Sequence, residues 1–368
     1  MRGIPMRIGI IGCGDIARKA YVPGIAAYHN LQLTAVADQD HERASSLACE
    51  AHVPACTVDE LLRRDDIDAV VNLTTPAAHA SVNRDILASG KHAYAEKPLA
   101  ISAPEAAPLI TQLRKSSLRL GCAPDTALGA GIQCCRQLLD SGAIGEPLSF
   151  TACMAGPGHE SWHPAPHFYY QRGGGPLYDM GPYYLTALVH LLGPAESVCA
   201  MGKRSWDERT ITSQPLAGST MQVDIDTHLN ACLRFQCGAI GSVIMSFDTW
   251  RHHLPRLEMH GREGSLALPD PNTFAGPVLL NTRSNPQWEE QELRHPIGRR
   301  GLGLAEMADA IANDRPHRTH CDIAYHVQEI MDAIHHAASS SETITLMTSC
   351  QRPEPLPEVL SWRGDADD

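Results

Sequence analysis

The feature that most constrains this chain is a glycine-containing turn close to its N-terminus. A continuous apolar run from Met6 leads into Gly12-Cys13-Gly14-Asp15-Ile16-Ala17, and a helical pattern follows over Ile16–Tyr28. This arrangement matches the G-x-G-x-x-G/A spacing that joins a strand to a helix. The first glycine makes the bend, the second lets the backbone approach a pyrophosphate, and the small Ala17 lets the helix pack closely. A lone match is weak, so the following elements decide its meaning.

The residues after this turn alternate between strand and helix patterns. Strands are predicted at 31–37, 67–73, 91–95 and 118–123, and helices at 58–64, 77–89 and 104–116. Such alternation predicts a parallel, doubly wound sheet whose ligand binds outside the carboxyl ends of the strands. Residues 1–126 are therefore predicted to form an α/β dinucleotide-binding domain of the Rossmann type.

An acidic residue, Asp38, directly follows the second of these strands. A carboxylate about 20 positions after the glycines accepts hydrogen bonds from the ribose hydroxyls of an adenosine and repels a 2′-phosphate. Asp38 therefore favours NAD over NADP. The alternative is that Asp38 only caps the helix that begins near His41.

Three further segments end strands at the same predicted edge of the sheet: Thr74-Thr75-Pro76, Glu96-Lys97-Pro98 and Pro124-Asp125. Because the carboxyl ends of parallel strands lie together, we expect these segments to converge on one cofactor. Lys97 is the candidate acid/base, with Glu96 and Pro98 fixing its position.

The glycine turn, Asp38, Thr75-Pro76 with His79, and Glu96-Lys97-Pro98 together resemble the Gfo/Idh/MocA family, the relatives of glucose–fructose oxidoreductase and inositol dehydrogenase. The Glu-Lys-Pro element is much more specific than the glycines alone. The resemblance implies NAD as the cofactor and places Glu96 near the nicotinamide ribose. The cofactor-binding residues expected are Gly12, Gly14, Asp15, Ile16, Asp38, Thr74, Thr75, Pro76, His79, Glu96, Lys97 and Asp125.

Residues 127–350 are predicted to form a second, α+β domain. After a helix at 130–140, strand patterns occur at 148–154, 197–203, 223–235, 239–247 and 257–260, with helices at 301–311 and 322–335. Short strands in succession predict an open, mainly antiparallel sheet. Residues 351–368, with three prolines, are predicted to be an extended tail with a frayed end. The family resemblance implies a homo-oligomer, a dimer or tetramer, formed through the outer face of this sheet.

Within the second domain, Gly173–Tyr184 runs into an apolar helix ending at Leu192. Asp179 and Tyr183 lie four residues apart and share the side opposite the apolar stripe. In the family this helix faces the nicotinamide, and the matching positions carry an aspartate and, in many members, a histidine. Tyr183 stands at that histidine position. It either relays a proton with Lys97, or positions substrate while Lys97 acts alone, or packs in a core. The candidate catalytic residues are Lys97, Asp179 and Tyr183.

The segment from His159 to His163 satisfies the zinc-protease pattern H-E-x-x-H. That chemistry needs a helix, whereas glycines and prolines surround this segment, so we predict no metal site. Aromatic rings suit the C–H faces of a sugar and imidazoles suit its hydroxyls, although a loop anchored by Trp162 is the alternative. The role of Arg251 stays open between an anion contact and a solvated side chain. The substrate-binding residues expected are His159, Trp162, His163, Tyr170, Asp179, Tyr183, Trp250, Arg251 and His252.

Composition excludes several classes of function. The formal net charge is −12 and no basic run relieves it, which disfavours a nucleic-acid partner. No apolar stretch approaches the roughly 20 residues that cross a bilayer, and no signal-peptide pattern opens the chain. The twelve cysteines are scattered and never form Cys-x-x-Cys, as expected in a reducing compartment. We therefore expect a cytoplasmic protein with neither a nucleic-acid nor a membrane partner.

Three hypotheses of function follow. The main one is an NAD-dependent oxidoreductase that acts on a secondary hydroxyl of a sugar, glycoside or cyclitol, with Lys97 as acid/base. The second is a glycoside hydrolase that uses NAD catalytically through transient oxidation, elimination, addition of water and re-reduction, possible for an anionic or sulfonated glycoside. The third is a catalytically silent NAD-binding sensor.

Overall fold

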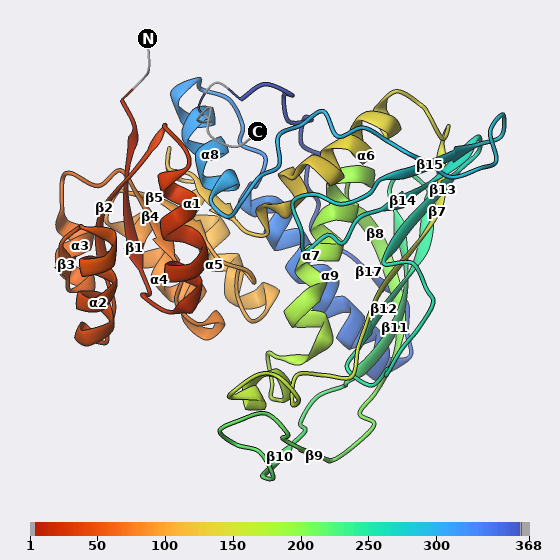
Figure 1. Cartoon of the computed structure of the whole chain (residues 1–368), viewed down its shortest axis with the longest axis horizontal. Coiled ribbons are helices and arrows are strands. Elements are labelled where there is room, and N and C mark those ends of the chain that lie inside the picture. Colours follow the sequence, from red (N-terminus) through yellow and green to blue (C-terminus); the bar gives the residue numbers. More distant parts are fainter. Residues whose placement is uncertain (1–3, 361, 363–368) are drawn as a thin grey trace. The chain divides into compact units, whose positions relative to one another are not determined.

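The computed structural model describes residues 4–360 and 362, and the contacts within it divide the chain into two compact units (Figure 1). The first unit contains Met1–Ala130, Arg294–Tyr325 and Pro353–Asp368, and the second contains Gly131–Leu293 and His326–Arg352. The predicted boundary after residue 126 therefore differs from this division. Arg294–Tyr325, which we assigned to the second domain, and Pro353–Asp368, which we assigned to the tail, belong to the first unit. Hydrogen bonds connect them to it. Cys122, for example, donates its backbone N–H to the carbonyl of Thr319 at 3.0 Å.

The first unit is built on a six-stranded, all-parallel sheet. Its order is β3-β2-β1-β4-β5-β6, the doubly wound arrangement that the alternating pattern predicted. The strands are β1 (Met6–Ile11), β2 (Leu31–Ala37), β3 (Ala55–Cys56), β4 (Ala69–Asn72), β5 (His92–Ala95) and β6 (Leu120–Cys122).

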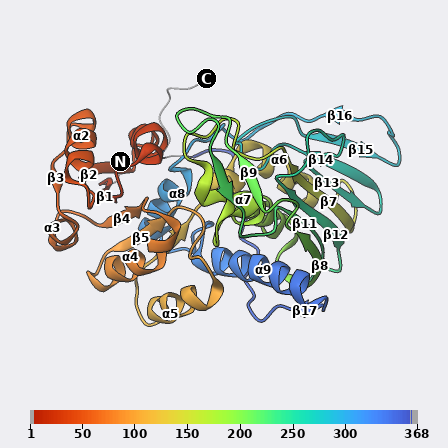
Figure 2. The same cartoon turned by 90° about the horizontal axis from the view of Figure 1, so that it is seen from below.

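Helices cover this sheet on both faces, as Figure 2 shows. An apolar cluster that includes Leu61, Ile86 and Leu109 packs α3, α4 and α5 against one face. The helices are α1 (Val22–Ala26), α2 (His41–Ala51), α3 (Val58–Arg63), α4 (Pro76–Ala88), α5 (Ala103–Leu113) and α8 (Leu302–Ala312), with a 3₁₀ turn at Asp125–Leu128.

The helix after the glycine turn differs from the continuous one predicted at 16–28. A π-helical turn spans Ala17–Tyr21, and α1 follows with Pro23 as its second residue. Proline has no N–H to donate to the preceding turn, so a regular α-helix cannot run through this position unbroken.

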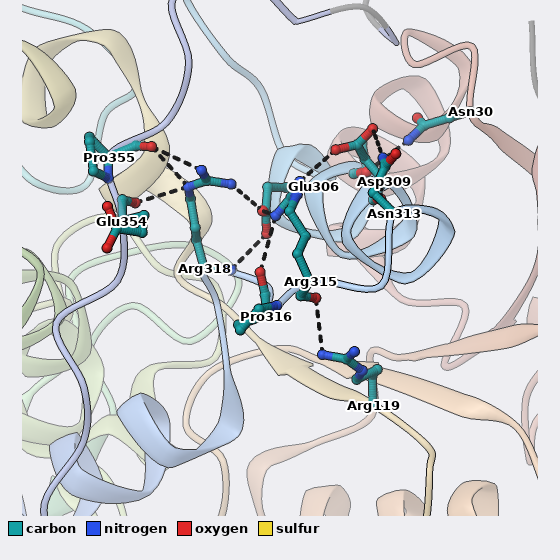
Figure 3. A network of polar contacts seen from close by, with 11 residues as sticks. Asn30, Arg119, Glu306, Asp309, Asn313, Arg315, Pro316, Arg318, Glu354 and Pro355 are labelled. Atoms are coloured by element: carbon teal, nitrogen blue, oxygen red, sulfur yellow. Dashed lines mark hydrogen bonds and ion pairs between the residues drawn. The ribbon is translucent and has the colours of Figure 1, made fainter.

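A buried ionic network in the first unit holds the C-terminal arm (Figure 3). The fully buried Glu306 of α8 accepts hydrogen bonds from Arg315 Nη1 at 2.5 Å and from Arg318 Nη1 at 2.6 Å. Arg318 also donates to the backbone carbonyls of Glu354 and Pro355, each at 2.9 Å. The predicted tail is thus extended and anchored at its start. Its predicted frayed end, from Gly364, lies outside the described residues.

The second unit is built on a nine-stranded mixed sheet of order β16-β15-β14-β13-β7-β12-β11-β8-β17. β7 and β12 are parallel and the other neighbours are antiparallel, which confirms a mainly antiparallel sheet. Its strands are β7 (Pro147–Ala155), β8 (Ala195–Lys203), β11 (His228–Phe235), β12 (Ile240–Ser246), β13 (Leu257–Gly261), β14 (Gly264–Leu268), β15 (Leu279–Thr282), β16 (Glu289–Glu290) and β17 (Ile344–Thr345).

Three long helices and a small hairpin complete the second unit. The helices are α6 (Ala130–Asp140), α7 (Gly175–Leu192) and α9 (Cys321–Ser340), of which α9 begins in the first unit. α7 packs against β7, β11 and β12 (Figure 1). The strands β9 (Glu208–Thr210) and β10 (Thr220–Gln222) form a separate two-stranded sheet, and a 3₁₀ turn spans Pro166–Tyr170. Within the described part of the chain, no helix has both the length and the apolar character needed to cross a membrane.

Candidate functional site

The strands of the first unit end level with one another. In the ladder, Ile11 pairs with Ala37 and Asn72, Asn72 pairs with Ala95, and Ala95 pairs with Cys122. The residues that follow each strand therefore share one edge, as expected for Thr74-Thr75-Pro76, Glu96-Lys97-Pro98 and Pro124-Asp125. Their convergence on one cofactor stays a prediction. This carboxyl edge is where doubly wound sheets bind their ligands.

The glycine turn has the geometry that a dinucleotide requires. Gly12 has a φ of +101°, and a Cβ added there would lie 2.6 Å from the backbone of Leu73. At Gly14 an added Cβ would meet nothing within 4 Å, so the backbone borders open space that a phosphate can approach. Asp15 and Ile16, both expected at the cofactor, are exposed beside the turn. The turn therefore fits a pyrophosphate.

Asp38 is held beside this turn. Its Oδ2 accepts the backbone N–H of Cys13 at 2.7 Å, and its Oδ1 accepts that of Asp40 at 2.9 Å. The cap of α2 is Asp40, whose side chain accepts from the N–H groups of Glu42 and Arg43. The alternative reading of Asp38 as a helix cap is therefore wrong, and its position suits the adenosine ribose.

Glu96 and Lys97 follow β5. Glu96 is buried, and its two carboxylate oxygens accept from the Tyr21 hydroxyl and from the Lys97 backbone N–H, each at 2.9 Å. Lys97 is half-buried, and its peptide bond to Pro98 is cis. The carboxylate of Glu96 thus fixes the backbone from which the Lys97 side chain extends. The contact with Tyr21 was missed, because nothing in the sequence pairs residues 75 positions apart.

His79 ties two of the edge segments together. It is buried, with Nδ1 2.6 Å from the Pro98 carbonyl oxygen and Nε2 3.0 Å from that of Thr74. Thr74 in turn donates its hydroxyl to Asn72 Oδ1 at 2.7 Å. Both ring nitrogens of His79 are engaged by backbone, so it positions these turns instead of presenting an atom to a cofactor. Thr75 and Pro76 are exposed at the start of α4.

Asp125 does not reach the surface, contrary to our expectation of a cofactor contact. It is fully buried, with Oδ1 3.0 Å from Arg300 Nη1 and Oδ2 2.9 Å from the Gly301 N–H. Burial raises the pKa of this carboxyl above its ordinary value. Its oxygens are used to hold the start of α8, which explains why a cofactor cannot contact them directly.

In the second unit, the H-E-x-x-H segment forms a single turn and not a helix. The two histidines have separate partners: His159 Nε2 lies 2.9 Å from Asp179 Oδ2, whereas His163 Nδ1 accepts the Ala165 N–H at 3.1 Å. Burial lowers the pKa of His163. The motif therefore lacks the helical geometry of a zinc protease.

The structure also brings His159 and Asp179 together in this unit. The side chains are 15% and 17% exposed. The rings of Tyr169, Phe247 and Trp162 surround the imidazole, with centroids 4.1, 4.6 and 4.9 Å away. The aromatic rings fix the orientation of the imidazole, and its contact with Asp179 was not predicted from the sequence.

Tyr183 and the helix around it are more buried than predicted. Tyr183 is 7% exposed, and from Gly181 to Leu192 every residue of α7 is buried. The predicted division into an apolar stripe and a polar side therefore applies only to the first turns, where Asp179 lies. Contacts of α7 with several strands bury its remaining sides.

Tyr170 is a core residue and not a surface ligand, which corrects our expectation. It is fully buried in a cluster with Ile211, Met221, Val223 and Phe247. Its hydroxyl donates to Glu160 and accepts the His159 N–H at 3.1 Å. Burial raises its pKa above the ordinary tyrosine value.

The remaining expected substrate residues are divided between a pocket and the surface. Trp250 lines a pocket of about 320 Å³ that also includes Arg209 and Asp248. Arg251 and His252 are not among its lining residues; Arg251 is exposed and His252 is half-buried. Trp162 is largely exposed.

One group of possible metal ligands occurs among the described residues, at the start of α9: His320, Cys321 and Asp322. The His320 Nδ1 accepts the Asp322 N–H at 3.1 Å, and burial raises the pKa of the Cys321 thiol. The three residues are consecutive in the chain and one imidazole nitrogen is already bonded to the backbone, so we assign no metal to them.

Comparison with known proteins shows which family the chain resembles. Residues 6–123 match the oxidoreductase family with an NAD-binding Rossmann fold, and residues 132–267 match the GFO/IDH/MocA C-terminal domain. A dTDP-3,4-didehydro-2,6-dideoxy-alpha-D-glucose 3-reductase of Streptomyces violaceoruber is 30% identical over 90% of this chain and 95% of its own. A 1,5-anhydro-D-fructose reductase of Ensifer adhaerens is 26% identical over 83% of this chain and 88% of its own.

A solved structure of levoglucosan dehydrogenase, in complex with NADH and L-sorbose, has the same fold. It matches with a TM-score of 0.78 at 21% identity and covers 93% of this chain and 99% of its own. The first unit, with its glycine turn and Asp38, is thus an NAD-binding domain. The protein belongs to the GFO/IDH/MocA family of oxidoreductases.

Proposed function

We propose that this protein transfers a hydride between NAD and a secondary alcohol carbon of a sugar, glycoside or cyclitol. The observation that carries the proposal is the carboxyl edge of the first unit. Lys97 extends there from a backbone held by Glu96, at the same edge as a turn that fits a dinucleotide. The names of two relatives, a dideoxyglucose derivative 3-reductase and an anhydrofructose reductase, support a carbohydrate as the substrate.

Lys97 is the proposed acid/base. Bound NAD supplies the hydride chemistry, so the chain has to hold the carbinol carbon and move the hydroxyl proton. In the oxidation direction the Lys97 amine accepts the proton of the hydroxyl, and in reduction its ammonium donates a proton to the carbonyl oxygen. The hydrogen bonds of Glu96 and His79 limit the freedom of the turn that carries Lys97.

The pair of His159 and Asp179 is the proposed holder of substrate hydroxyls. A carboxylate accepts hydrogen bonds from sugar hydroxyls, and a neutral imidazole offers one donor and one acceptor. The Nε2 atom of His159 is bonded to Asp179, so the imidazole places its polar edge next to the carboxylate. Tyr183, with little exposure, is a packing or positioning residue in this proposal.

A second candidate keeps the same residues but regenerates NAD in each cycle. Oxidation of a glycoside acidifies the neighbouring C–H, the aglycone is eliminated, water adds, and the ring is reduced again. The His159–Asp179 pair supports this candidate, because an imidazole held by a carboxylate is suited to protonate a leaving aglycone. Arg251 is exposed on the surface, so its position does not support binding of an anionic glycoside by this residue.

The deciding experiment incubates the purified protein with NAD and a panel of free sugars, cyclitols and aryl glycosides. Stoichiometric NADH with an unbroken glycosidic bond supports the dehydrogenase. Release of the aglycone with catalytic NAD and no net NADH supports the hydrolase instead. Tight NAD binding with no turnover on any member would favour a silent sensor and contradict both.

A further inference from the structure

A pocket in the second unit contains residues that the proposed chemistry does not use. We call it the tryptophan pocket; it has a volume of about 320 Å³ and its walls include Trp206, Trp250, Glu160, Glu208, Arg209 and Asp248. Trp206 and Trp250 are 49% and 83% exposed. Two large aromatic side chains open to solvent around one pocket are costly for a protein to leave uncovered, and they mark binding surfaces.

The floor of the tryptophan pocket is a rigid ionic network. Arg209, whose side chain is 8% exposed, bonds to Glu160 at 2.5 Å and to Asp248. It also donates to the backbone carbonyls of Pro157 at 3.1 Å and Phe247 at 3.0 Å. Its guanidinium lies 4.7 Å from the Trp206 ring centroid. One buried cation thus joins β9, the end of β12 and the loop after β7.

The second oxygen of Asp248 completes this network. It accepts from the hydroxyls of Ser205 at 2.5 Å and Thr227 at 2.6 Å. The Nε of Arg209 is buried and has no hydrogen-bond partner among the described residues. An unpaired buried donor costs free energy, so the network keeps one unsatisfied polar group.

The charges of the pocket restrict its ligand. Three carboxylates, those of Glu160, Glu208 and Asp248, and one guanidinium line the pocket, so its walls carry an excess of negative charge. A phosphate or pyrophosphate would be repelled, whereas sugar hydroxyls donate to carboxylates and the C–H faces of a pyranose pack on indole rings.

The tryptophan pocket adjoins the proposed substrate-holding pair. Phe247 lines the pocket and packs its ring 4.6 Å from that of His159, and Glu160 is the next residue in the chain. A ligand held at His159 and Asp179 would therefore have the pocket as its neighbour in the same unit.

We propose that the tryptophan pocket binds a second, uncharged pyranose ring, so that the substrate is a disaccharide or a longer glycoside. This inference rests on the proposed function for the reaction itself. The residues proposed to bind the second ring are those of the tryptophan pocket and take no part in that reaction. It also separates this chain from a relative whose named substrate carries dTDP, because the pocket disfavours that diphosphate.

The test measures binding of cellobiose, maltose and lactose to the NAD-loaded protein by calorimetry, with D-glucose and dTDP as comparison ligands. The variants are Trp250→Ala and, as a matched control, Trp288→Ala, which removes a 42% exposed tryptophan that is not part of the pocket. We expect at least one disaccharide to bind more tightly than glucose. Trp250→Ala should weaken it about tenfold or more, while glucose binding and the control stay unchanged.

The outcomes separate this inference from the proposed function. Equal disaccharide affinities in Trp250→Ala and Trp288→Ala, or displacement of the disaccharide by dTDP, would overturn the pocket assignment. If NADH still forms from monosaccharides in that case, the proposed function stands. Trp250-dependent disaccharide binding without any turnover would support the pocket and contradict the proposed function. Because Trp250 is largely exposed, the variant should fold, which circular dichroism checks.

Discussion

Lys97 is the residue on which the proposed proton transfer depends. Its replacement by alanine removes the amine but leaves the backbone hydrogen bond to Glu96 in place. We expect Lys97→Ala to lower kcat by about 10²–10⁴-fold, the usual contribution of a positioned acid/base, with little change in NAD affinity. Steady-state kinetics and NAD titration measure the two effects. Lys115→Ala, at an exposed lysine of the same unit, is the matched control, and retained turnover in Lys97→Ala would sink the assignment.

A second residue-scale prediction separates His159 from Tyr183. His159 contacts Asp179 at 2.9 Å, whereas Tyr183 is 7% exposed within α7. We expect His159→Gln to lower kcat/KM about 10²-fold and Tyr183→Phe to change it by less than about threefold. The kinetics of both variants, with His167→Gln as an exposed control from the same segment, test this. The opposite ranking would mean that the tyrosine hydroxyl relays the proton.

At the scale of elements, the network around Glu306 holds the C-terminal arm to α8. Besides Arg315 and Arg318, Glu306 accepts the Arg318 backbone N–H at 2.7 Å. The arm is fixed further by the His295 ring, 2.8 Å from the carbonyl of the buried Leu356. Removing the charge of Glu306 would leave two guanidinium groups without their shared buried partner.

We therefore expect Glu306→Gln to lower the free energy of unfolding by about 2–4 kcal/mol and to loosen the arm. Denaturant unfolding measures the first effect, and hydrogen exchange over residues 353–360 the second. Glu146→Gln breaks an exposed ion pair, in which the Glu146 side chain is 56% and the Arg262 side chain 64% exposed. This change should cost less than about 1 kcal/mol. Equal losses in the two variants would show that the Glu306 network does not hold the arm.

The elements that could be predicted from the sequence are those with a local signal. Strand Leu31–Ala37 was predicted with its observed bounds, and α7 ends at Leu192 as expected. In both elements the hydrophobic periodicity and the residues that end the element lie within a short stretch of sequence. The short strands β3, β9, β10 and β14 to β17 were missed. Strands such as β16, with two exposed glutamates, have no apolar alternation and depend on pairing with a neighbour.

The same distinction applies to the site. The places of Asp38 and Glu96 at the carboxyl edge were predictable because each directly follows a strand whose end is visible in the sequence. Arg209 was not, because its partners Glu160 and Asp248 lie 49 and 39 residues away and no pattern links them. Asp125 was predicted to contact the cofactor and Tyr170 the substrate, because residue type does not reveal burial. Both side chains are fully buried.

At the scale of the whole molecule, the open face of the nine-stranded sheet bears on the proposed oligomer. Exposed and buried residues alternate along β11, so one face of the strand points to solvent. Met201 is 79% exposed and pairs directly with Asn230, while the exposed Cys199 pairs with Cys232. Directly opposite residues share a face, so an apolar methionine and two thiols lie on the open side.

We propose that this face forms the homo-oligomer interface, and we expect a solution mass of two or four times 39.9 kDa. Met201→Asp would bury a charge in that interface and should reduce the mass to that of a monomer. Ile297→Asp, at a 59% exposed position in the first unit, is the control and should leave the mass unchanged. Light scattering measures the mass, and thiol labelling should reach Cys199 and Cys232 faster in Met201→Asp than in the parent protein. A monomeric parent protein, or an unchanged mass in Met201→Asp, would exclude this face as the interface.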